Sequence, residues 1–242
     1  MLPLRDTAPI YRTPWVTWFL IFINLVVFLF EISLPPDVLN HLLYYFALIP
    51  RSISDPDWAM AHGMDPKPYF TFYTNTFLHG SFFHIFSNMW TLWIFGDNVE
   101  SKMGHGRFFL FYSLCGVLAS ITHYSLYSDS TVPALGASGA ISGVMGAYML
   151  LFPLSRIIFL VPIFIFPFFF EWPALVFIGF WFFMQFFYGT TTFLLGDHAT
   201  NIAFWAHIGG FVAGIILYRF FLIGAQQFHY PEQYYRRYTG GI

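Results

Sequence analysis

The sequence is poor in charged residues and in cysteine. Only 9% of its 242 residues are charged, with Lys+Arg 10 against Asp+Glu 12, whereas an ordinary soluble domain carries about a quarter. This scarcity excludes one large soluble globule, a disordered chain and a nucleic-acid-binding protein. The one cysteine, Cys115, excludes an intrachain disulfide bond and a cysteine-rich metal site.

Apolar and aromatic residues take the place of the missing charge. Hydrophobic residues make up 57% of the chain and aromatic residues 24%, and the mean hydropathy is +0.62. The apolar residues form continuous runs rather than the alternation that a membrane-spanning β-barrel requires. Composition and pattern together predict an integral membrane protein built from helices.

Six apolar stretches predict membrane-spanning helices, several of them at the short end of the length of about 20 residues that a bilayer requires. They are residues 15–30, 82–95, 108–127, 137–153, 172–188 and 203–223. Between the first two lies a large loop, residues 34–81, which we expect at the level of the lipid headgroups. A further apolar segment, residues 157–170, contains Pro162 and Pro167, so we expect a short interfacial or re-entrant piece there.

The distribution of basic residues gives the orientation. If both termini are cytoplasmic, eight of the ten Lys and Arg residues fall on the cytoplasmic side, as the positive-inside tendency requires. These eight are Arg5, Arg12, Lys102, Arg107, Arg156, Arg219, Arg236 and Arg237. We therefore expect a cytoplasmic segment over residues 1–14, a membrane domain over residues 15–224 and a cytoplasmic tail over residues 225–242, in a bacterial-type plasma membrane.

Four polar residues lie in or at the edge of the predicted spans, where lipid disfavours them: His84, Asn88, Ser138 and His207. Polar groups in such places face the interior of a bundle or a water-filled cavity, and by default they indicate a functional site. The alternative is that they only form hydrogen bonds between helices.

Small residues recur at intervals of four in the fourth and sixth predicted helices. Gly139 and Gly143 lie on one stripe of the fourth helix, which Gly136 precedes, and Gly210 and Gly214 lie on one stripe of the sixth. Such spacing lets two helix backbones approach closely. We therefore expect these five glycines to serve helix packing, a role that could account for all of them.

Ser138 and His207 form a candidate nucleophile and base. Ser138 opens the fourth helix, where free backbone N–H groups and the positive end of the helix dipole would stabilise a developing oxyanion. If the two helices touch, His207 can accept the Ser138 proton and return it to a leaving amine. Each residue alone is weak evidence, because a lone G-x-S-G motif is unspecific and a histidine often links two helices. No carboxylate lies inside either helix, so the pair predicts a dyad rather than a triad.

His84 and Asn88 are four residues apart and therefore share a face of the second helix. Their donors, together with the backbone N–H of Ser138, would form an oxyanion hole. A zinc site is the competing interpretation, but two histidines without a carboxylate or cysteine cluster would leave it underfilled. We expect no metal and no cofactor.

Three motifs resemble those of the rhomboid intramembrane serine proteases: Gly136-Ala137-Ser138-Gly139, His84-x-x-x-Asn88 and Ala206-His207-x-x-Gly210-x-x-x-Gly214. The resemblance implies an all-α membrane protein, a six-transmembrane-helix bundle with a large first external loop. It implies cleavage of a peptide bond in or beside a transmembrane helix of a single-pass or polytopic membrane protein. It also implies a substrate gate over residues 172–201 and a structural role for Glu100.

The sequence departs from the rhomboid pattern at two points. Many relatives place an aromatic residue one turn after the nucleophile, where this chain has Ser142, so something else must orient His207. The arginine that many relatives carry in the first external loop is not evident at residues 70–73.

Two other classes of protein fit the sequence less well. A catalytically inactive rhomboid-like protein that binds membrane clients would normally lack one member of the dyad, and both are present. A transporter or channel would bury acidic residues in its spans, but Glu31 and Glu171 lie at helix ends, where solvent or headgroups can hold them.

Hydrolysis needs water, so we expect a cavity that includes Ser81 and Ser87 and opens to the external side. Substrate segments with small or helix-weakening residues near that side would unwind most readily. The expected partners are thus membrane-protein substrates and the lipid bilayer, and not nucleic acid or metal.

Overall fold

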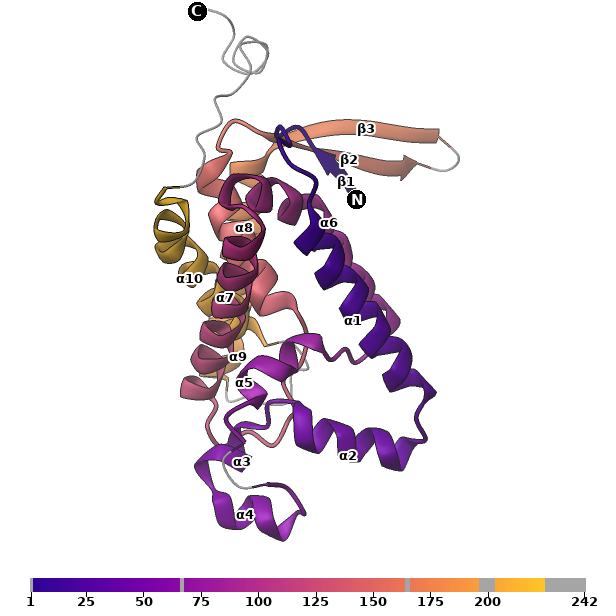
Figure 1. The fold of residues 1–242 in the computed structure, drawn as a ribbon, viewed down its shortest axis with the longest axis vertical. Helices are drawn as coiled ribbons and strands as arrows, with labels where there is room; N and C mark the ends of the chain where they lie inside the picture. Colours follow the sequence, from indigo (N-terminus) through magenta and orange to yellow (C-terminus); the bar gives the residue numbers. More distant parts are fainter. Residues whose placement is uncertain (1, 66–67, 164–165, 196–202, 225–242) are drawn as a thin grey trace, which may run out of the picture.

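The chain folds as a bundle of helices with a small β-sheet across one end (Figure 1). The structure is a computed structural model and describes residues 2–65, 68–163, 166–195 and 203–224. The end of the bundle that carries the sheet is named the sheet end here. The opposite end, where residues 36–65 and 68–77 lie, is named the loop end.

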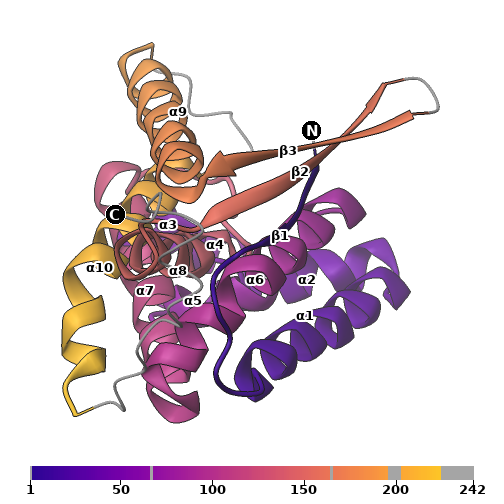
Figure 2. The ribbon, with the colours of Figure 1, turned by 90° about the horizontal axis from the view of Figure 1, so that it is seen from above.

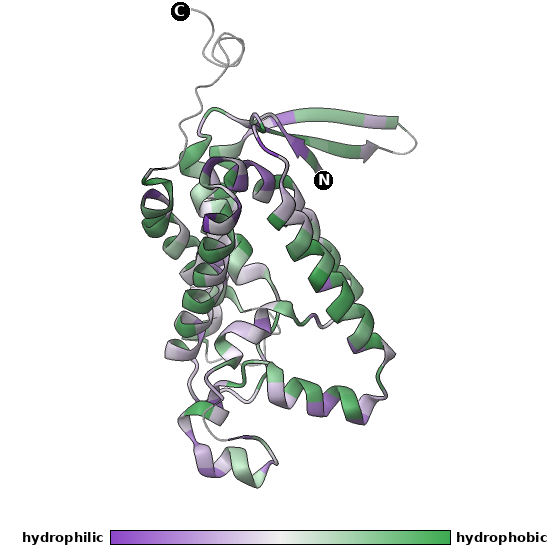
Figure 3. Cartoon of the chain, viewed as in Figure 1, coloured by the Kyte–Doolittle hydropathy of each residue, from purple (hydrophilic) through white to green (hydrophobic). Residues whose placement is uncertain are grey.

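In the described part of the chain, six helices form the bundle, and their positions correspond to the six apolar stretches of the sequence. They are α1 (Trp15–Ser33), α6 (Phe82–Met103), α7 (His105–Leu126), α8 (Ser138–Leu151), α9 (Ala174–Leu194) and α10 (Phe204–Leu222). Four of them, α1, α7, α9 and α10, are long and apolar enough to cross a membrane, and α8 is a shorter apolar helix. Figure 3 shows apolar residues along most of the height of the bundle. The chain is therefore a mostly helical, multi-pass membrane protein.

The sheet corrects the expectation of an all-α protein. Strands β1 (Leu2–Asp6), β2 (Arg156–Ile163) and β3 (Phe166–Pro173) are antiparallel and lie in the order β1-β2-β3. The described residues of the apolar segment at 157–170, expected to be a short interfacial or re-entrant piece, thus lie in the paired strands β2 and β3, the β2–β3 hairpin. Its β-branched and aromatic residues favour strands, and Pro162 and Pro167 are partners near the tip of the hairpin.

Short helices fill the loop between α1 and α6. They are α2 (Pro36–Phe46), α3 (Pro50–Ser54), α4 (Pro56–Ala61), α5 (Thr71–Thr74) and the 3-10 helix η1 (Asn75–Phe77). The loop is tied to the segment before α8, because Leu48 and Ala134 exchange two backbone hydrogen bonds of 3.1 and 2.8 Å. The Gly136 N–H also donates to the Asn75 carbonyl oxygen at 2.9 Å. These bonds hold the chain in place just before Ser138.

Helix α8 lies at the centre of the bundle, with α6, α7, α9 and α10 around it (Figure 2). Every residue from 139 to 148 is buried. The small residues of this helix let its neighbours approach from several sides. The first residue of α8, Ser138, is therefore held by the best-packed helix of the molecule.

Two carboxylates hold helix ends together. Glu100, near the end of α6, is fully buried and accepts hydrogen bonds from the backbone N–H groups of Val16 (2.9 Å) and Thr17 (2.7 Å) in the first turn of α1. The Glu100 carboxylate thus stabilises the positive, N-terminal end of α1. Glu100 belongs to the part of α6 that continues beyond residue 95, where the predicted span ended. Glu31, expected to be held by solvent or headgroups, is buried instead. Its carboxylate accepts a hydrogen bond from the backbone N–H of His79 (3.2 Å).

Candidate active site

Ser138 and His207 meet across the interface between α8 and α10. Ser138 is the first residue of α8, and His207 lies in the first turn of α10. The His207 Nε2 atom is 2.8 Å from the Ser138 Oγ atom. At this distance a proton can pass directly from the hydroxyl to the imidazole.

Glycines allow the two helix backbones to touch. A Cβ atom on Gly210 would lie 2.0 Å from the carbonyl oxygen of Gly139, and one on Gly214 would lie 2.0 Å from the carbonyl oxygen of Gly143. Neither position admits a side chain, because the atoms in the way belong to backbone and cannot swing aside. This contact sets the distance between the candidate nucleophile and base.

Gly136 lies in the turn before α8 rather than between the helices. Its φ of 120° is a backbone conformation that side chains rarely permit. A Cβ atom there would lie 2.6 Å from His84 Nε2 and 3.5 Å from Asn88 Nδ2. Gly136 thus lets two polar side chains of α6 lie against the backbone next to Ser138.

His84 and Asn88 belong to the first two turns of α6, where Ser81 caps the helix by accepting a hydrogen bond from the His84 N–H (3.1 Å). Asn88 is buried, and its Nδ2 atom donates to Nε2 of His79 at 3.0 Å. Burial, with the neighbouring His84, lowers the pKa of His79 to about 3. The His79 ring is therefore neutral and able to accept this hydrogen bond.

Helix α9 orients His207 from the side opposite Ser138. The Nδ1 atom of His207 donates to Oε1 of Gln185 at 2.8 Å, which leaves Nε2 free to accept the Ser138 proton. The ring of Trp181, one turn before Gln185, lies 6.0 Å from the His207 ring at an interplanar angle of 36°. The aromatic neighbour that is missing at Ser142 thus comes from another helix. The Ser142 hydroxyl itself donates to the Ser138 carbonyl oxygen (2.6 Å).

A cavity of about 620 Å³ lies over this pair at the loop end. The start of α6, the end of α7, the segment before α8 and the start of α10 line it. Its polar lining includes Ser81, His84, Ser87, Asn88, His123, Ser130, Ser138 and His207. The cavity is large enough for a short extended peptide and offers several polar partners to water.

The chain matches the family model described as the Rhomboid domain over residues 66–224. It belongs to the rhomboid family. The matched region contains α6, α7, α8, α9 and α10, and so every side chain that lines the cavity. The resemblance first drawn from three short motifs is thereby confirmed.

Several known rhomboid proteins are similar to part of this chain. It is 37% identical over 97 residues to "Rhomboid protein 1, mitochondrial" of Saccharomyces cerevisiae, and 35% identical over 95 residues to "Presenilin-associated rhomboid-like protein, mitochondrial" of Homo sapiens. It is 39% identical over 83 residues to "Rhomboid protease GluP" of Bacillus subtilis. These alignments cover 38%, 38% and 34% of this chain, but only 27%, 25% and 16% of the respective relatives. They therefore compare a part of each relative and not its whole.

The start of α8 adds backbone donors to the rhomboid site. The Ile141 N–H donates to the Ala137 carbonyl oxygen at 3.0 Å, so the N–H groups of Ser138, Gly139 and Ala140 precede the regular bonds of the helix. They lie at the positive end of the helix, where a negative charge is stabilised.

The described part of this rhomboid holds no group of three or more His, Cys, Asp or Glu side chains that could bind a metal ion. The expected gate, residues 172–201, consists of the end of β3, then α9 and Leu195. Its remaining residues from 196 on, like the expected tail at 225–242, lie outside the described residues.

Three residues of this rhomboid site were not among the site residues predicted from the sequence: His79, Trp181 and Gln185. Gln185 carried a usable signal, since it is a polar residue inside a run of apolar residues from 180 to 187, the same criterion that singled out His84. Trp181 lies one turn away and shares its face. His79 had no such signal, because it precedes the helix.

Proposed function

We propose that this rhomboid is an intramembrane serine endopeptidase with Ser138 as nucleophile and His207 as general base. The observation that carries the proposal is the 2.8 Å contact between Ser138 Oγ and His207 Nε2, two of the polar residues that line the cavity. Gln185 supports it, because its carbonyl oxygen holds the His207 tautomer that accepts a proton at Nε2. The reaction needs neither a metal nor a cofactor.

In the first step the Ser138 Oγ atom attacks the carbonyl carbon of the scissile peptide bond while its proton passes to His207 Nε2. The π electron pair moves onto the carbonyl oxygen. That oxyanion accepts hydrogen bonds from the Ser138 N–H and from the side chains of His84 and Asn88. The C–N bond then breaks, the leaving amine takes the proton from His207, and the acyl group remains as an ester on Ser138.

Water completes the reaction. A water molecule from the cavity gives a proton to His207 Nε2 while its oxygen attacks the ester carbonyl carbon. The ester C–O bond breaks, and the Ser138 oxygen recovers the proton from His207. The net change is the addition of one water molecule across one peptide bond.

The orientation in the membrane decides which end of a substrate is cut. Basic residues gather at the sheet end, in β1, in β2, in the segment between β1 and α1, and at the adjoining helix ends. They are Arg5, Arg12, Lys102, Arg107, Arg156 and Arg219. The positive-inside tendency places that end in the cytoplasm, with six spans and both termini inside. The cavity at the loop end then opens outward, and it would admit transmembrane substrates that unwind near the external surface.

A serine-directed probe tests this mechanism. Purified protein in detergent is incubated with a fluorescent fluorophosphonate, and the same samples are assayed for cleavage of a co-reconstituted transmembrane substrate. We expect labelling and cleavage in the wild type, none in Ser138→Ala, and a loss of about a hundredfold or more in His207→Ala. Ser87→Ala is the matched control, because Ser87 also lines the cavity but its hydroxyl bonds only to helix backbone.

Two results would overturn the proposal. Labelling that persists in Ser138→Ala would remove this residue as the nucleophile. A folded wild-type protein that neither reacts nor cleaves, yet retains a transmembrane client through purification, would identify a catalytically inactive rhomboid-like binding protein.

A further inference from the structure

The two faces of the β2–β3 hairpin differ at its base, where only one of them carries charged residues. Among the described side chains, the register of the two strands places on its inner face Ile157, Phe159, Val161, Phe166, Phe168, Phe170 and Trp172. These side chains are all apolar. The charged residues of the hairpin, Arg156 and Glu171, lie on the other face, with Arg156 Nη1 3.8 Å from Glu171 Oε2.

The base of the inner face rests on the helices. Ile157 and Phe159 are buried in the core. The Phe159 ring stacks on Phe170 at 5.2 Å and meets the ring of Phe177, from α9, at 5.1 Å. The inner face therefore points from the sheet toward the layer that the helices occupy.

The tip of the inner face has no such cover. The hairpin runs across the helix ends and extends sideways beyond them (Figures 1 and 2). Phe166 and Phe168 are 64% and 52% exposed, although they point the same way as the buried Phe159. The rings of Phe166 and Phe168 thus lie beside the bundle, at the level where the helices end, and face the same side of the sheet as the helices.

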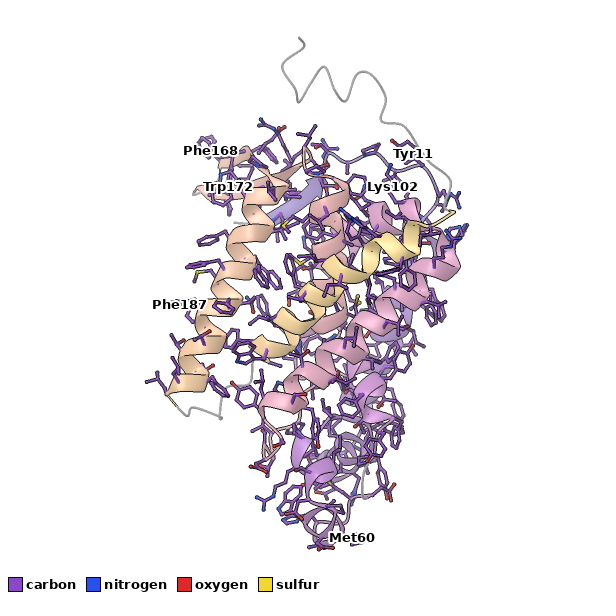
Figure 4. All side chains as sticks on the ribbon, turned by 90° about the vertical axis from the view of Figure 1, so that its left-hand side faces the viewer. Tyr11, Met60, Lys102, Phe168, Trp172 and Phe187 are labelled. Carbon is purple, nitrogen blue, oxygen red and sulfur yellow. The ribbon has the colours of Figure 1, made fainter. Side chains whose placement is uncertain are left out.

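The apolar surface of α9 adjoins the base of the hairpin. The helix begins at Ala174, directly after β3, and exposes Val176, Phe180 and Phe183 by more than half. Figure 4 shows Phe168, Trp172 and Phe187 along one side of the molecule. In a multi-pass membrane protein, lipid is what covers the exposed side of such a helix.

We propose that the exposed part of the inner face, with Phe166 and Phe168 near the tip and Trp172 at the base, docks into the headgroup region of the lipid leaflet at the sheet end. A planar, partly exposed tryptophan beside phenylalanines is typical of residues that settle there. The level also carries cations, for example Lys102, whose Nζ atom lies over the Tyr11 ring at 5.0 Å. Anionic headgroups complement such a surface.

The docked hairpin would hold the sheet end of α9. Pro173 ends β3 and Ala174 begins α9, so no flexible loop separates the strand from the helix. The same helix carries Trp181 and Gln185, which contact His207. The lipid docking rests on the hairpin alone and does not depend on the proposed protease activity.

Fluorescence quenching at single introduced cysteines tests the docking. The native Cys115 is buried, so it does not compete for label. Phe168→Cys in the full-length protein is labelled with an environment-sensitive fluorophore and reconstituted in vesicles of phosphatidylcholine and phosphatidylglycerol. Lipids with a spin label near the headgroup should quench this fluorophore several-fold more than they quench one at Phe169→Cys. Phe169 is the matched control, since it is 62% exposed on the opposite face.

The remaining outcomes are also decisive. Equal quenching of both positions by aqueous iodide, with none by the lipid quencher, would show an inner face in water and overturn the proposal. A label at Phe168→Cys that both quenchers fail to reach would mean that a second copy of the chain covers it, for example along the β3 edge, and would also overturn it. Should Phe168→Cys fail to reconstitute, Phe166→Cys on the same face carries the identical test, again with Phe169→Cys as the control.

Discussion

Helix α10 contacts α8 and α9 through different groups. Between α8 and α10, backbone meets backbone at Gly139, Gly143, Gly210 and Gly214. Helix α9 instead touches α10 through large rings, such as Phe182 stacked on Phe211 at 4.4 Å. Its buried residues are three, Ala174, Ile178 and Gly189, out of 21.

The two contacts determine different features of the site: the distance between Ser138 and His207, and the orientation of the His207 ring. Backbone contacts leave no freedom, so the distance between Ser138 and His207 is fixed by the fold itself. Ring contacts tolerate small displacements, because each ring can slide over its neighbour at little cost. The orientation of the His207 ring therefore depends on the more loosely held helix, through Gln185 and Trp181.

The largest loss of stability is expected when a side chain is introduced at the backbone contact between α8 and α10. In Gly214→Ala the new Cβ atom would lie 2.0 Å from the Gly143 carbonyl oxygen, so the two helices must separate. We expect a loss of about 3 kcal/mol or more in unfolding free energy, together with the loss of activity. Thermal unfolding in detergent and substrate cleavage measure the two effects.

Gly179 on α9 supplies the matched control. A Cβ atom there meets nothing within 4 Å, and alanine favours a helix by about 1 kcal/mol over glycine. Gly179→Ala should therefore leave stability unchanged or slightly raised. Equal unfolding temperatures for Gly179→Ala and Gly214→Ala would contradict the contrast between the two helices.

The contact between α8 and α10 could be predicted from the sequence. The four-residue spacing of glycines in two separate stretches indicates which helix faces meet, and Ser138 and His207 lie on those faces. The contact of α9 with His207 was harder to predict. An apolar helix such as α9 shows aromatic residues on every side, so its pattern does not reveal which side faces His207.

The fold was predicted to a similar extent. The positions of α1, α7, α9 and α10 follow from apolar length alone. The sheet does not, because β1 is a five-residue strand whose partner β2 lies about 150 residues away in the chain, and local propensity carries no information about such pairing. The buried position of Glu31 was missed for the same reason, since its partner His79 is distant in sequence.

The next effect concerns the hydrogen bond from α9. Gln185→Leu keeps the side-chain volume roughly constant but removes the acceptor for His207 Nδ1. We expect kcat to fall about tenfold to a hundredfold, or about 1.4 to 2.7 kcal/mol in barrier, while KM changes little. Gln185→Glu keeps an acceptor oxygen and should recover most of the activity. A purely structural role would instead lower stability in both variants and leave kcat of the folded fraction unchanged.

A smaller effect is expected from the ring beside the base. Trp181→Leu removes the aromatic neighbour of His207 but leaves the Gln185 hydrogen bond in place. We expect a loss of severalfold in kcat, since an aromatic contact contributes about 0.5 to 1.5 kcal/mol. Phe180→Leu is the control, because Phe180 is 56% exposed on the outside of α9. Similar losses in the two variants would show that α9 is sensitive to any change rather than to this contact.

The smallest effect concerns how the sheet end of α8 is held. Asp6 in β1 accepts a hydrogen bond from the hydroxyl of the buried Tyr148 in α8. Burial raises the Asp6 pKa from 3.8 to about 7, against the opposing effect of this hydrogen bond. Between these two values the folded protein binds more protons than the unfolded chain, so its stability falls as the pH rises and levels off above about 7.

Asp6→Asn separates this contribution from the other titrating groups. We expect the wild type to lose about 1 kcal/mol of stability between pH 6 and 8, after allowance for the partial exposure of Asp6. The variant should lack that part of the slope, because its amide keeps an acceptor for Tyr148 and does not titrate. Neutral burial of His79 acts in the opposite direction, since its pKa of about 3 makes the folded state lose stability as the pH falls below 6.5. Thermal unfolding of both proteins across pH 5 to 8 measures the difference, and parallel curves would show that the attachment of β1 to α8 does not depend on protonation of Asp6.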